Sequence, residues 1–293
     1  MKIFLTGGTG FNGKYLLDLL KDEEVLLLTR KRDYASPREN VKALSGDLSN
    51  TEEWRKELER FSPDVTVHLA WDGIPYDYGE KISEENLRNS SNLMSVLFDI
   101  GCPKIVAAGT CWEYGKNQGQ LDEENITHPI KPIAIAKDTL YKTTKEIASE
   151  KGVDFLWARF FYVYGAGRKE TTLIPYLVNC AIKNEKPDIK NPFSSYDFIY
   201  VEDVANAMFE LVKNGRGIES YNIGTGKSTS ILDVSKIIYS SLNLNSPFDN
   251  MTFPEGESFD NFLADISKMK HHLNWEPRFS LEDGIKKTIS SIQ

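Results

Sequence analysis

The sequence predicts a doubly wound α/β fold, in which helices cover both faces of a parallel sheet. Short apolar segments alternate with amphipathic segments through the first half of the chain. Several of the short segments are apolar at nearly every position, as expected for strands that are buried on both faces. The first of them ends in a glycine-rich turn that leads directly into an amphipathic segment. This order of strand, turn and helix is typical of the fold.

Strands and helices can be assigned by this alternation. The expected strands are Lys2–Thr6, Val25–Thr29, Val41–Leu44, Val65–Ala70, Ile105–Gly109 and Phe155–Arg159. The expected helices are Phe11–Lys21, Thr51–Arg60, Ser83–Ile100 and Ile133–Lys151. Thr51 or Asn50 is expected to cap the second helix, because two glutamates follow in its first turn.

The alternation becomes less regular after Gly165. Helices are expected at Thr171–Asn184, Ala205–Val212 and Ile231–Leu242, strands at Phe198–Val201 and Tyr221–Ile223, and a loop rich in Pro, Gly and Asn from Asn243 to Gly256. No repeat or linker separates an independent domain. We therefore predict a dinucleotide-binding domain at residues 1–165, to which residues 193–227 return. Residues 166–192 and 228–293 are expected to form a smaller C-terminal α/β substrate lobe.

Composition excludes several classes of function. The chain has 293 residues and a net charge of -8, so a nucleic-acid-binding surface of clustered Lys and Arg is not expected. No apolar run has the roughly 18 residues of a membrane helix, and no signal peptide is recognisable, so the protein is expected in the cytoplasm. Cys102, Cys111 and Cys180 lack the spacing of a metal site or a disulfide framework, and they are expected to be free thiols.

The glycine-rich turn has the spacing of a dinucleotide-binding loop. Glycines stand at positions 7, 10 and 13, between the first strand and the first helix. Gly7 permits a tight turn, Gly10 lets the backbone approach a diphosphate, and Gly13 allows the helix to pack closely on the sheet. The free N–H groups and the dipole of the helix N-terminus favour an anion. The alternative is an ordinary glycine-rich turn, but its position between a strand and a helix favours the dinucleotide interpretation.

Gly7-Gly8-Thr9-Gly10-Phe11-Asn12-Gly13 resembles the nucleotide loop of the extended short-chain dehydrogenase/reductase family, which includes nucleotide-sugar epimerases, reductases and dehydratases. The resemblance continues, in the family's order, through Gly46-Asp47-Leu48, His68-Leu69-Ala70-Trp71, the run from Arg159 to Gly167, the run from Tyr196 to Val204, Asn222-Ile223-Gly224-Thr225-Gly226 and Ala264-Asp265-Ile266-Ser267-Lys268.

This resemblance implies a Rossmann sheet, a nicotinamide cofactor, a nucleotide sugar as the small-molecule substrate and a role in carbohydrate biosynthesis. It also implies a homodimer formed by the helices Ser83–Ile100 and Ile133–Lys151. The residues that it assigns to the cofactor are Gly7, Gly10, Phe11, Asn12, Gly13, Arg30, Asp47, Leu48, Leu69, Ala70, Trp71 and Lys137.

The end of the second strand favours NADP(H) over NAD(H). An NAD-binding chain of this fold usually has an acidic residue there, which accepts hydrogen bonds from the ribose hydroxyls. This chain has Thr29-Arg30-Lys31-Arg32. A carboxylate would repel the 2′-phosphate of NADP, whereas the guanidinium of Arg30 can bind it with two hydrogen bonds, assisted by Lys31 or Arg32. The alternative is a solvated basic turn.

The expected catalytic groups are incomplete. Family members use a Ser or Thr after the fifth strand and a Tyr-x-x-x-Lys motif on the next helix, in which the Tyr transfers a proton. Thr110 matches the hydroxyl residue, with a capping role as the alternative. In Pro132-Ile133-Ala134-Ile135-Ala136-Lys137, Lys137 matches the motif's lysine and Ile133 stands in place of the tyrosine.

Tyr141-Lys142-Thr143-Thr144-Lys145 has the literal spelling of the motif, but starting there would move the phenol by about 12 Å along the helix. Tyr141 is therefore expected to be a surface or packing residue. Because isoleucine cannot transfer a proton, another group must supply it, or the reaction needs none from the protein, or the site is inactive. The candidates are Tyr162, Tyr164, Cys111 and Tyr114, and Tyr162 is of most interest because it replaces the family's Asn. For each of them the alternative is a packing role in the core.

Further departures from the family pattern narrow the function. The family's dehydratases have acids after the strand-five Thr, whereas this chain has Cys111-Trp112, which favours ketone reduction or epimerisation. The arginines with which many relatives bind the sugar's diphosphate are replaced by Tyr196 or missing from Ser258–Leu263. Either residues such as Lys190 and Arg168 replace them, or the site for the sugar's diphosphate is absent. We therefore expect an NADP(H)-dependent nucleotide-ketosugar reductase, with an epimerase and a catalytically silent NADP(H)-binding protein as alternatives.

Overall fold

The computed structural model describes residues 1–74, 79–254 and 257–292. At its centre is a seven-stranded sheet with the order β11-β7-β5-β4-β1-β2-β3, in which all neighbours are parallel. Its strands are β1 (Lys2–Thr6), β2 (Glu24–Thr29), β3 (Val41–Ser45), β4 (Val65–His68), β5 (Lys104–Thr110), β7 (Asp154–Phe160) and β11 (Ile218–Ile223). The strand order reverses between β1 and β4, where folds of this type open a crevice for a ligand.

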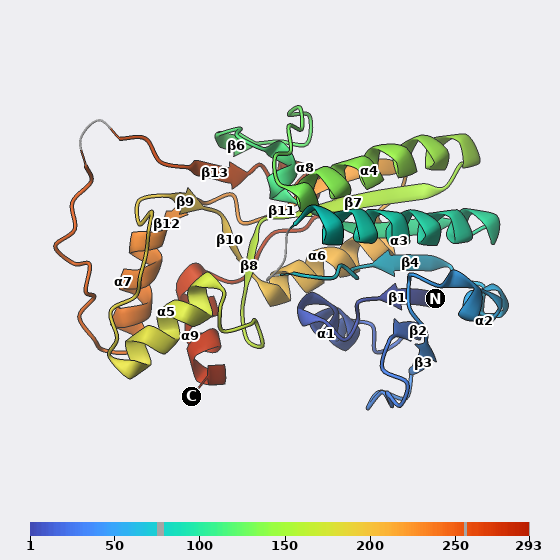
Figure 1. Cartoon of the computed structure of the whole chain (residues 1–293), viewed down its shortest axis with the longest axis horizontal. Coiled ribbons are helices and arrows are strands. Elements are labelled where there is room, and N and C mark those ends of the chain that lie inside the picture. The colour runs from blue at the N-terminus through green and yellow to red at the C-terminus, as the bar shows by residue number, and fades with distance from the viewer. Residues whose placement is uncertain (75–78, 255–256, 293) are drawn as a thin grey trace.

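Helices cover both faces of the sheet, so the predicted doubly wound Rossmann fold is confirmed (Figure 1). One face carries α1 (Phe11–Leu19) and α6 (Val201–Asn214), and the other carries α2 (Arg55–Phe61), α3 (Glu80–Asp99) and α4 (Pro132–Lys151). The strands form two separate apolar cores with these helices, because side chains on a strand point alternately to its two faces. Both faces are therefore buried, as the apolar strands predicted.

The remaining elements form a smaller lobe beyond the carboxyl ends of the sheet strands (Figure 1). They are β6 (Gly119–Leu121), β8 (Tyr162–Tyr164), α5 (Leu173–Lys183), β9 (Ser195–Tyr196), β10 (Phe198–Tyr200), β12 (Thr229–Ser230), α7 (Ile231–Ser241), β13 (Asn261–Ala264), α8 (Ser267–Leu273) and α9 (Leu281–Ile292). A third apolar core joins α5, α7 and α9 to β8 and β10. Helix α8 instead packs against the large sheet, because its Met269 lies in the core with α1 and α6.

The predicted helix Thr51–Arg60 is wrong in its first half. Thr51–Glu53 is a single 3-10 turn, and the α-helix begins only at Arg55. Neither Asn50 nor Thr51 caps it through its side chain. Trp54 explains the break, because its indole is fully buried and donates a hydrogen bond of 2.9 Å to the carbonyl oxygen of Asp47.

Other boundaries also differ from the prediction. Strand β4 ends at His68 rather than at Ala70, because the chain turns there to meet the glycine loop. Within the expected loop from Asn243 to Gly256, the described residues contain no helix or strand, and Glu255 and Gly256 lie outside the described part of the chain. Among the described helices, none combines the length and the apolar character that crossing a membrane requires.

Candidate active site

Two adjoining cavities follow the carboxyl ends of the central strands. The larger one, of about 500 Å³, lies between the sheet and the smaller lobe, and the other, of about 220 Å³, lies over the ends of β1, β2 and β4. Gly7, Gly10, Leu69 and Trp71 line both cavities, so together they form one continuous groove. The groove crosses the β1–β4 position at which the strand order reverses.

The glycine loop forms the floor of the groove and requires glycine at two positions. Gly7 has a φ of +76°, and a Cβ atom on it would lie 2.6 Å from the amide nitrogen of Ala70. A Cβ atom on Gly13 would lie 2.3 Å from the carbonyl oxygen of Gly7. The loop therefore packs directly on the end of β4 and on the first turn of α1. Its conformation leaves no room for side chains where a ligand's diphosphate would approach.

The start of α1 has the groups that a dinucleotide phosphate needs. Gly10 is the N-cap residue and provides no side chain to bond the free N–H groups of the first turn. Asn12 lines the larger cavity, and its Oδ1 atom is buried without a hydrogen-bond partner among the described residues. Rotating the amide would present its N–H groups instead. These residues, with Phe11, fit the dinucleotide that the sequence predicts.

The smaller cavity contains the residues predicted at the adenosine end. Arg30, Asp47, Leu48 and Ala70 line it, together with Asp72, which the sequence analysis missed. The guanidinium of Arg30 lies 2.8 Å from a carboxylate oxygen of Asp72 and 3.9 Å from one of Asp47. Because 64% of the Arg30 side chain is exposed, this ion pair is weak and can be exchanged for another anion.

Lys137 lies at the junction of the large cavity with the sheet. It is buried on α4, and its ammonium nitrogen donates a hydrogen bond of 2.5 Å to the carbonyl oxygen of Ala108 on β5. The same nitrogen lies 4.1 Å from the ring centroid of Trp71. Burial lowers the pKa of Lys137 to about 7, against the opposing effect of the Glu113 charge. Ile133, one helical turn earlier, lines the same cavity.

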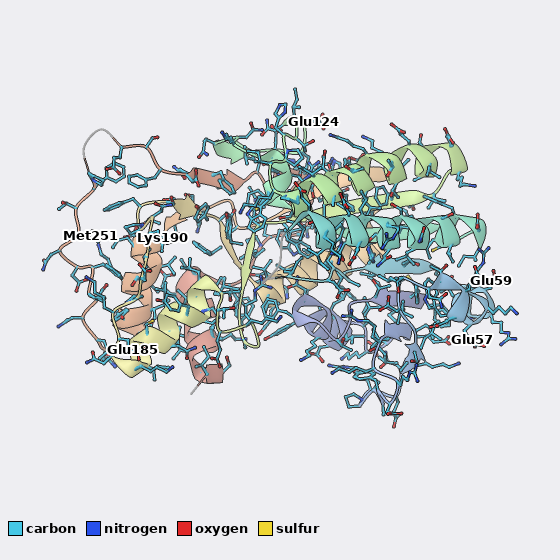
Figure 2. All side chains as sticks on the ribbon, viewed as in Figure 1. Glu57, Glu59, Glu124, Glu185, Lys190 and Met251 are labelled. Atoms are coloured by element: carbon cyan, nitrogen blue, oxygen red, sulfur yellow. The ribbon has the colours of Figure 1, made fainter. Side chains whose placement is uncertain are left out.

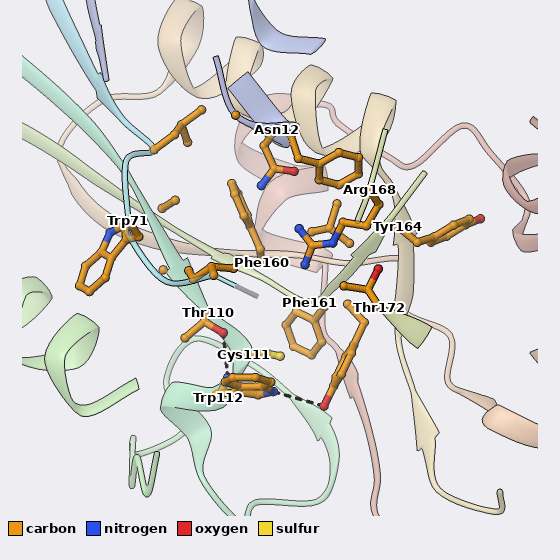
Figure 3. A pocket seen from close by; sticks show the side chains of 18 of the residues that line it. Asn12, Trp71, Thr110, Cys111, Trp112, Phe160, Phe161, Tyr164, Arg168 and Thr172 are labelled. Atoms are coloured by element: carbon orange, nitrogen blue, oxygen red, sulfur yellow. Dashed lines mark hydrogen bonds between the residues drawn. The ribbon is translucent and has the colours of Figure 1, made fainter. Parts of the chain in front are cut away.

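Thr110 ends β5 and has a structural role in addition to its place in the cavity wall. Its hydroxyl oxygen accepts a hydrogen bond of 3.4 Å from the amide of Trp112 and caps the short turn η2 (Cys111–Tyr114), as Figure 3 shows. Its own amide donates to the Glu113 carboxylate at 2.8 Å. Since capping uses the hydroxyl as an acceptor, its O–H remains available to donate to a ligand.

The literal Tyr-x-x-x-Lys register does not lie in the groove. Tyr141 packs between Phe155 and Trp157, with ring centroids at 6.1 and 5.6 Å, and it is not among the residues that line either cavity. It belongs to the core beneath α3 and α4. Tyr141 is therefore a packing residue.

Of the other proton-transfer candidates, Tyr162 and Cys111 line the larger cavity. The Tyr162 hydroxyl accepts a hydrogen bond of 3.3 Å from the indole nitrogen of Trp112. Its ring lies 4.4 Å from that of Tyr196, and burial raises the pKa of Tyr162. Burial also raises the pKa of the Cys111 thiol. Both groups therefore hold their protons tightly.

Tyr114 and Tyr164 direct their hydroxyls away from the cavity. Tyr114 is fully buried, and its hydroxyl donates to Asn222 at 2.7 Å. Tyr164 contributes to the cavity wall, but its hydroxyl donates to the carbonyl oxygen of Leu281 at 3.2 Å and points outward in Figure 3. The sequence could not distinguish these tyrosines, because strand periodicity does not fix the direction of an aromatic residue at a strand end.

Of the two cations predicted for the sugar's diphosphate, Arg168 lines the larger cavity. Arg168 lies there beside the start of α5, opposite Trp71, with its guanidinium carbon 5.0 Å from the Phe11 ring centroid (Figure 3). Lys190, the other predicted cation, lies beside α7 and does not line either cavity (Figure 2).

Sequence reasoning missed several other residues that line the larger cavity. They are Ile74, Phe160, Phe161, Thr171, Thr172, Leu173, Ile174 and Pro175.

Comparison with known proteins agrees with this arrangement. A UDP-glucuronate 4-epimerase from Thermodesulfobacterium geofontis is 29% identical over 86% of this chain and 79% of its own length. A dTDP-4-dehydro-6-deoxyglucose reductase from Escherichia coli is 25% identical over 99% of this chain and 97% of its own length.

The fold also matches solved structures. A UDP-glucose 4-epimerase from Thermotoga maritima, crystallised with UDP-glucose, superposes with a TM-score of 0.85 at 23% identity over 100% of this chain and 98% of its own. A dTDP-glucose 4,6-dehydratase from Bacillus anthracis, in complex with NAD, has a TM-score of 0.86 at 20% identity over 100% of this chain and 96% of its own. At this level of identity the likeness concerns the fold.

The sequence profile of one family covers the glycine loop, the sheet strands and the candidate catalytic residues in a single match, over residues 3–224. The chain therefore belongs to the NAD dependent epimerase/dehydratase family.

Proposed function

We propose that this protein is an NADP(H)-dependent oxidoreductase that reduces a nucleotide-linked keto sugar. The observation that carries the proposal is the continuity of the groove, in which the glycine loop leads to Thr110 and Lys137 at the end of β5. We expect the reacting end of a dinucleotide and the substrate to share this cavity of about 500 Å³. The likeness to the Escherichia coli reductase over nearly its full length supports the same reaction class.

The choice of NADP(H) rests on Arg30. Its side chain lines the smaller cavity and is paired through exposed contacts with Asp72 and, at a longer distance, with Asp47. A 2′-phosphate carries more charge than one carboxylate and can replace that contact. The absence of an acid directly after β2 removes the usual acceptor for the ribose hydroxyls of NAD.

The chain's own residues have distinct roles in the proposed reaction. A bound nicotinamide dinucleotide supplies the hydride. The Thr110 hydroxyl donates a hydrogen bond to the reacting carbonyl oxygen, and Lys137 holds the nicotinamide ribose. Tyr162 stays a candidate for the group that contacts the sugar, because its ring and its hydroxyl border the cavity. Trp112 and Phe161 exclude water around it.

A second candidate function is epimerisation, which the Thermodesulfobacterium relative favours. A third is a silent NADP(H)-binding protein, which Ile133 favours because it removes the family's proton donor. The absence of an acid after Thr110, where Cys111 and Trp112 stand, argues against dehydration. The three candidates differ in whether the cofactor is consumed and in whether the sugar is changed.

Purified protein mixed with NADPH and a panel of 4-keto nucleotide sugars tests the proposal. Loss of the nicotinamide absorbance with one sugar is expected. Interconversion of two 4-hydroxy nucleotide sugars in the presence of NADP⁺, without its net reduction, would indicate the epimerase instead. Tight NADPH binding without change in any sugar would indicate the silent protein. Calorimetry without heat from either coenzyme would contradict all three.

The homodimer implied by the family resemblance is also a proposal. It would use the outer faces of α3 and α4. The exposed positions on α3 include Lys81, Glu84, Arg88, Asn92, Ser95 and Asp99, so such an interface would be mostly polar. Sedimentation velocity tests it, and a monomer at micromolar concentration would exclude a stable dimer.

A further inference from the structure

Ile133 leaves the proposed reduction without the family's proton donor, and the cavity offers few replacements. Burial raises the pKa of both Tyr162 and Cys111, which makes each of them a poor acid. The hydroxyl of Tyr164 is directed to a backbone carbonyl outside the cavity. The guanidinium of Arg168 does not release a proton at physiological pH. Among the described residues that line the cavity, Lys137 is the strongest remaining acid.

The position of Lys137 suits this role. Its ammonium has three N–H donors, of which one bonds the carbonyl oxygen of Ala108 at 2.5 Å. The face of the Trp71 ring lies on another side, 4.1 Å away. Ile133 is shorter than a tyrosine, so the space that a phenol would occupy stays open one helical turn from Lys137. We expect a ligand oxygen in that space to approach the Lys137 ammonium, because both residues line the same cavity.

The charges around Lys137 adjust its acidity without pairing with it. From η2, the carboxylate of Glu113 acts on it through space, but this carboxylate is already bonded to Arg159 of β7 at 2.8 Å. From β4, His68 faces it and is neutral, because burial lowers the pKa of His68 to about 3. On α4, the carboxylate of Asp138 bonds Lys142 at 2.6 Å instead. A buried ammonium without an ion-pair partner is disposed to give up its proton.

We propose that the Lys137 ammonium donates the proton to the carbonyl oxygen of the substrate, in place of the missing tyrosine. This inference rests on the proposed reductase function. A bound NADPH would supply the hydride to the carbonyl carbon, and Lys137 would give its proton to the carbonyl oxygen. The products would be an alcohol, NADP⁺ and a neutral lysine amine. Water then returns a proton to the amine. The acidity of Lys137, with a pKa of about 7, matches a donor that works at neutral pH.

The first test needs neither cofactor nor substrate. The protein is acetylated with trace acetic anhydride between pH 5 and 10, and the rate at each lysine is followed by mass spectrometry, because only the neutral amine reacts. Lys137 is expected to reach half of its maximal rate near pH 7. Lys145, an exposed lysine on the same helix, serves as the reference. A Lys137 midpoint no lower than that of Lys145 would overturn the inference.

The second test separates proton donation from ribose binding. Lys137→Arg keeps a cation, so NADPH is expected to bind within a few-fold of the unchanged protein. Because arginine does not release its proton, kcat/KM is expected to fall by about 10²–10⁴-fold. The decrease of kcat/KM above pH 7, which is expected of the unchanged protein, should be absent from this variant. Lys137→Met provides the comparison in which both the cation and the proton are lost.

The outcomes distinguish the two proposals. Turnover by the unchanged protein, with Lys137→Arg equally active or with the same pH profile, would refute the inference and leave the proposed function standing. No turnover by the unchanged protein with any ketone in the panel would refute the proposed function and this inference with it. A Lys137→Arg protein that no longer binds NADPH would assign Lys137 to positioning alone and would also refute the inference.

Discussion

The carboxylate of Glu113 and the guanidinium of Arg159 form an ion pair of 2.8 Å inside the protein, with 0% and 2% of their side chains exposed. The pair joins η2 to β7 beneath the candidate active site. Glu113 also accepts hydrogen bonds from the Thr110 amide and from the Trp157 indole. This one carboxylate therefore fixes the backbone on which the Thr110 hydroxyl is presented.

Replacing Glu113 with Ala is expected to lower the free energy of unfolding by about 3–5 kcal/mol, because the buried charge of Arg159 would lose its carboxylate partner and keep only neutral ones such as the Tyr114 hydroxyl. Urea denaturation followed by circular dichroism measures the loss. Arg60→Ala is the control, since Arg60 pairs with Glu57 on the surface of α2 with 74% and 44% exposure and should change the stability by less than about 1 kcal/mol. Equal losses in the two variants would contradict the role of the buried pair.

His68 should make the protein sensitive to acid. Its imidazole is fully buried between the Thr6 hydroxyl at 2.8 Å and the Ser90 hydroxyl at 3.0 Å. Burial lowers its pKa to about 3, with a smaller effect from the Lys137 charge. Between pH 6.5, where the unfolded chain takes up the proton, and about pH 3, the unfolded state binds more protons than the folded state. Stability is therefore lost as the pH falls through this window.

The expected contribution of His68 to that loss is up to about 1.4 kcal/mol per pH unit. His68→Gln keeps the two hydrogen-bonding ends but does not titrate, so its stability should fall less steeply between pH 6 and pH 4. Urea denaturation at each pH measures the slopes. His128→Gln, at an exposed histidine, should reproduce the slope of the unchanged protein. If His68→Gln did so too, the titration of His68 would have no part in acid unfolding.

Sequence reasoning could predict the sheet because its strands are short and mostly apolar, and because helices follow β1, β3 and β4. It could also place Arg30 and Thr110 at the groove, because the carboxyl ends of parallel strands meet at one edge. The two-residue strand β9 offers too little periodicity for such a prediction. Sequence reasoning could also not predict the hydrogen bonds that the buried Asp197 accepts from the Thr225 amide at 2.8 Å and from the Ala264 amide at 3.1 Å. These contacts join segments that are distant in sequence.

Among the residues that line the two cavities, some could be predicted from the sequence and others could not. Lys137 could be assigned because Pro132–Lys137 resembles the family's Pro-x-Tyr-Gly-x-x-Lys motif. Asp72 and Thr172 could not, because they lie in loops whose positions depend on contacts made by other parts of the chain. The partner that Asp72 provides for Arg30 is one such contact.

Arg30 should determine the coenzyme preference. Arg30→Asp places a third carboxylate beside Asp47 and Asp72, and it is expected to weaken NADPH binding by at least about 10-fold while NADH binding improves. Calorimetric titration with both coenzymes measures the change. Arg32→Ala is the matched control at a basic residue that does not line the adenosine cavity, and it should leave the ratio nearly unchanged. Unaltered NADPH affinity in Arg30→Asp would remove the argument for NADP(H).

Ile133→Tyr should restore a phenol at the position where the family has its proton donor. Ile133 is 3% exposed and lines the cavity one turn before Lys137, so a tyrosine side chain can extend into the open space. Because a nearby cation lowers the pKa of a phenol, the new tyrosine is expected to act as the proton donor and to raise kcat/KM for ketone reduction by about 10²-fold. The decline of kcat/KM at alkaline pH should move to higher pH.

Ile133→Phe is the matched control for this variant, because it adds the same ring without the hydroxyl. It should fill part of the cavity and reduce turnover. NADPH oxidation by both variants, followed between pH 6 and pH 10, makes the comparison. A gain in both variants would mean that the shape of the cavity limits the reaction. A loss in both would mean that the cavity does not accommodate a ring at position 133, and it would contradict the expected gain.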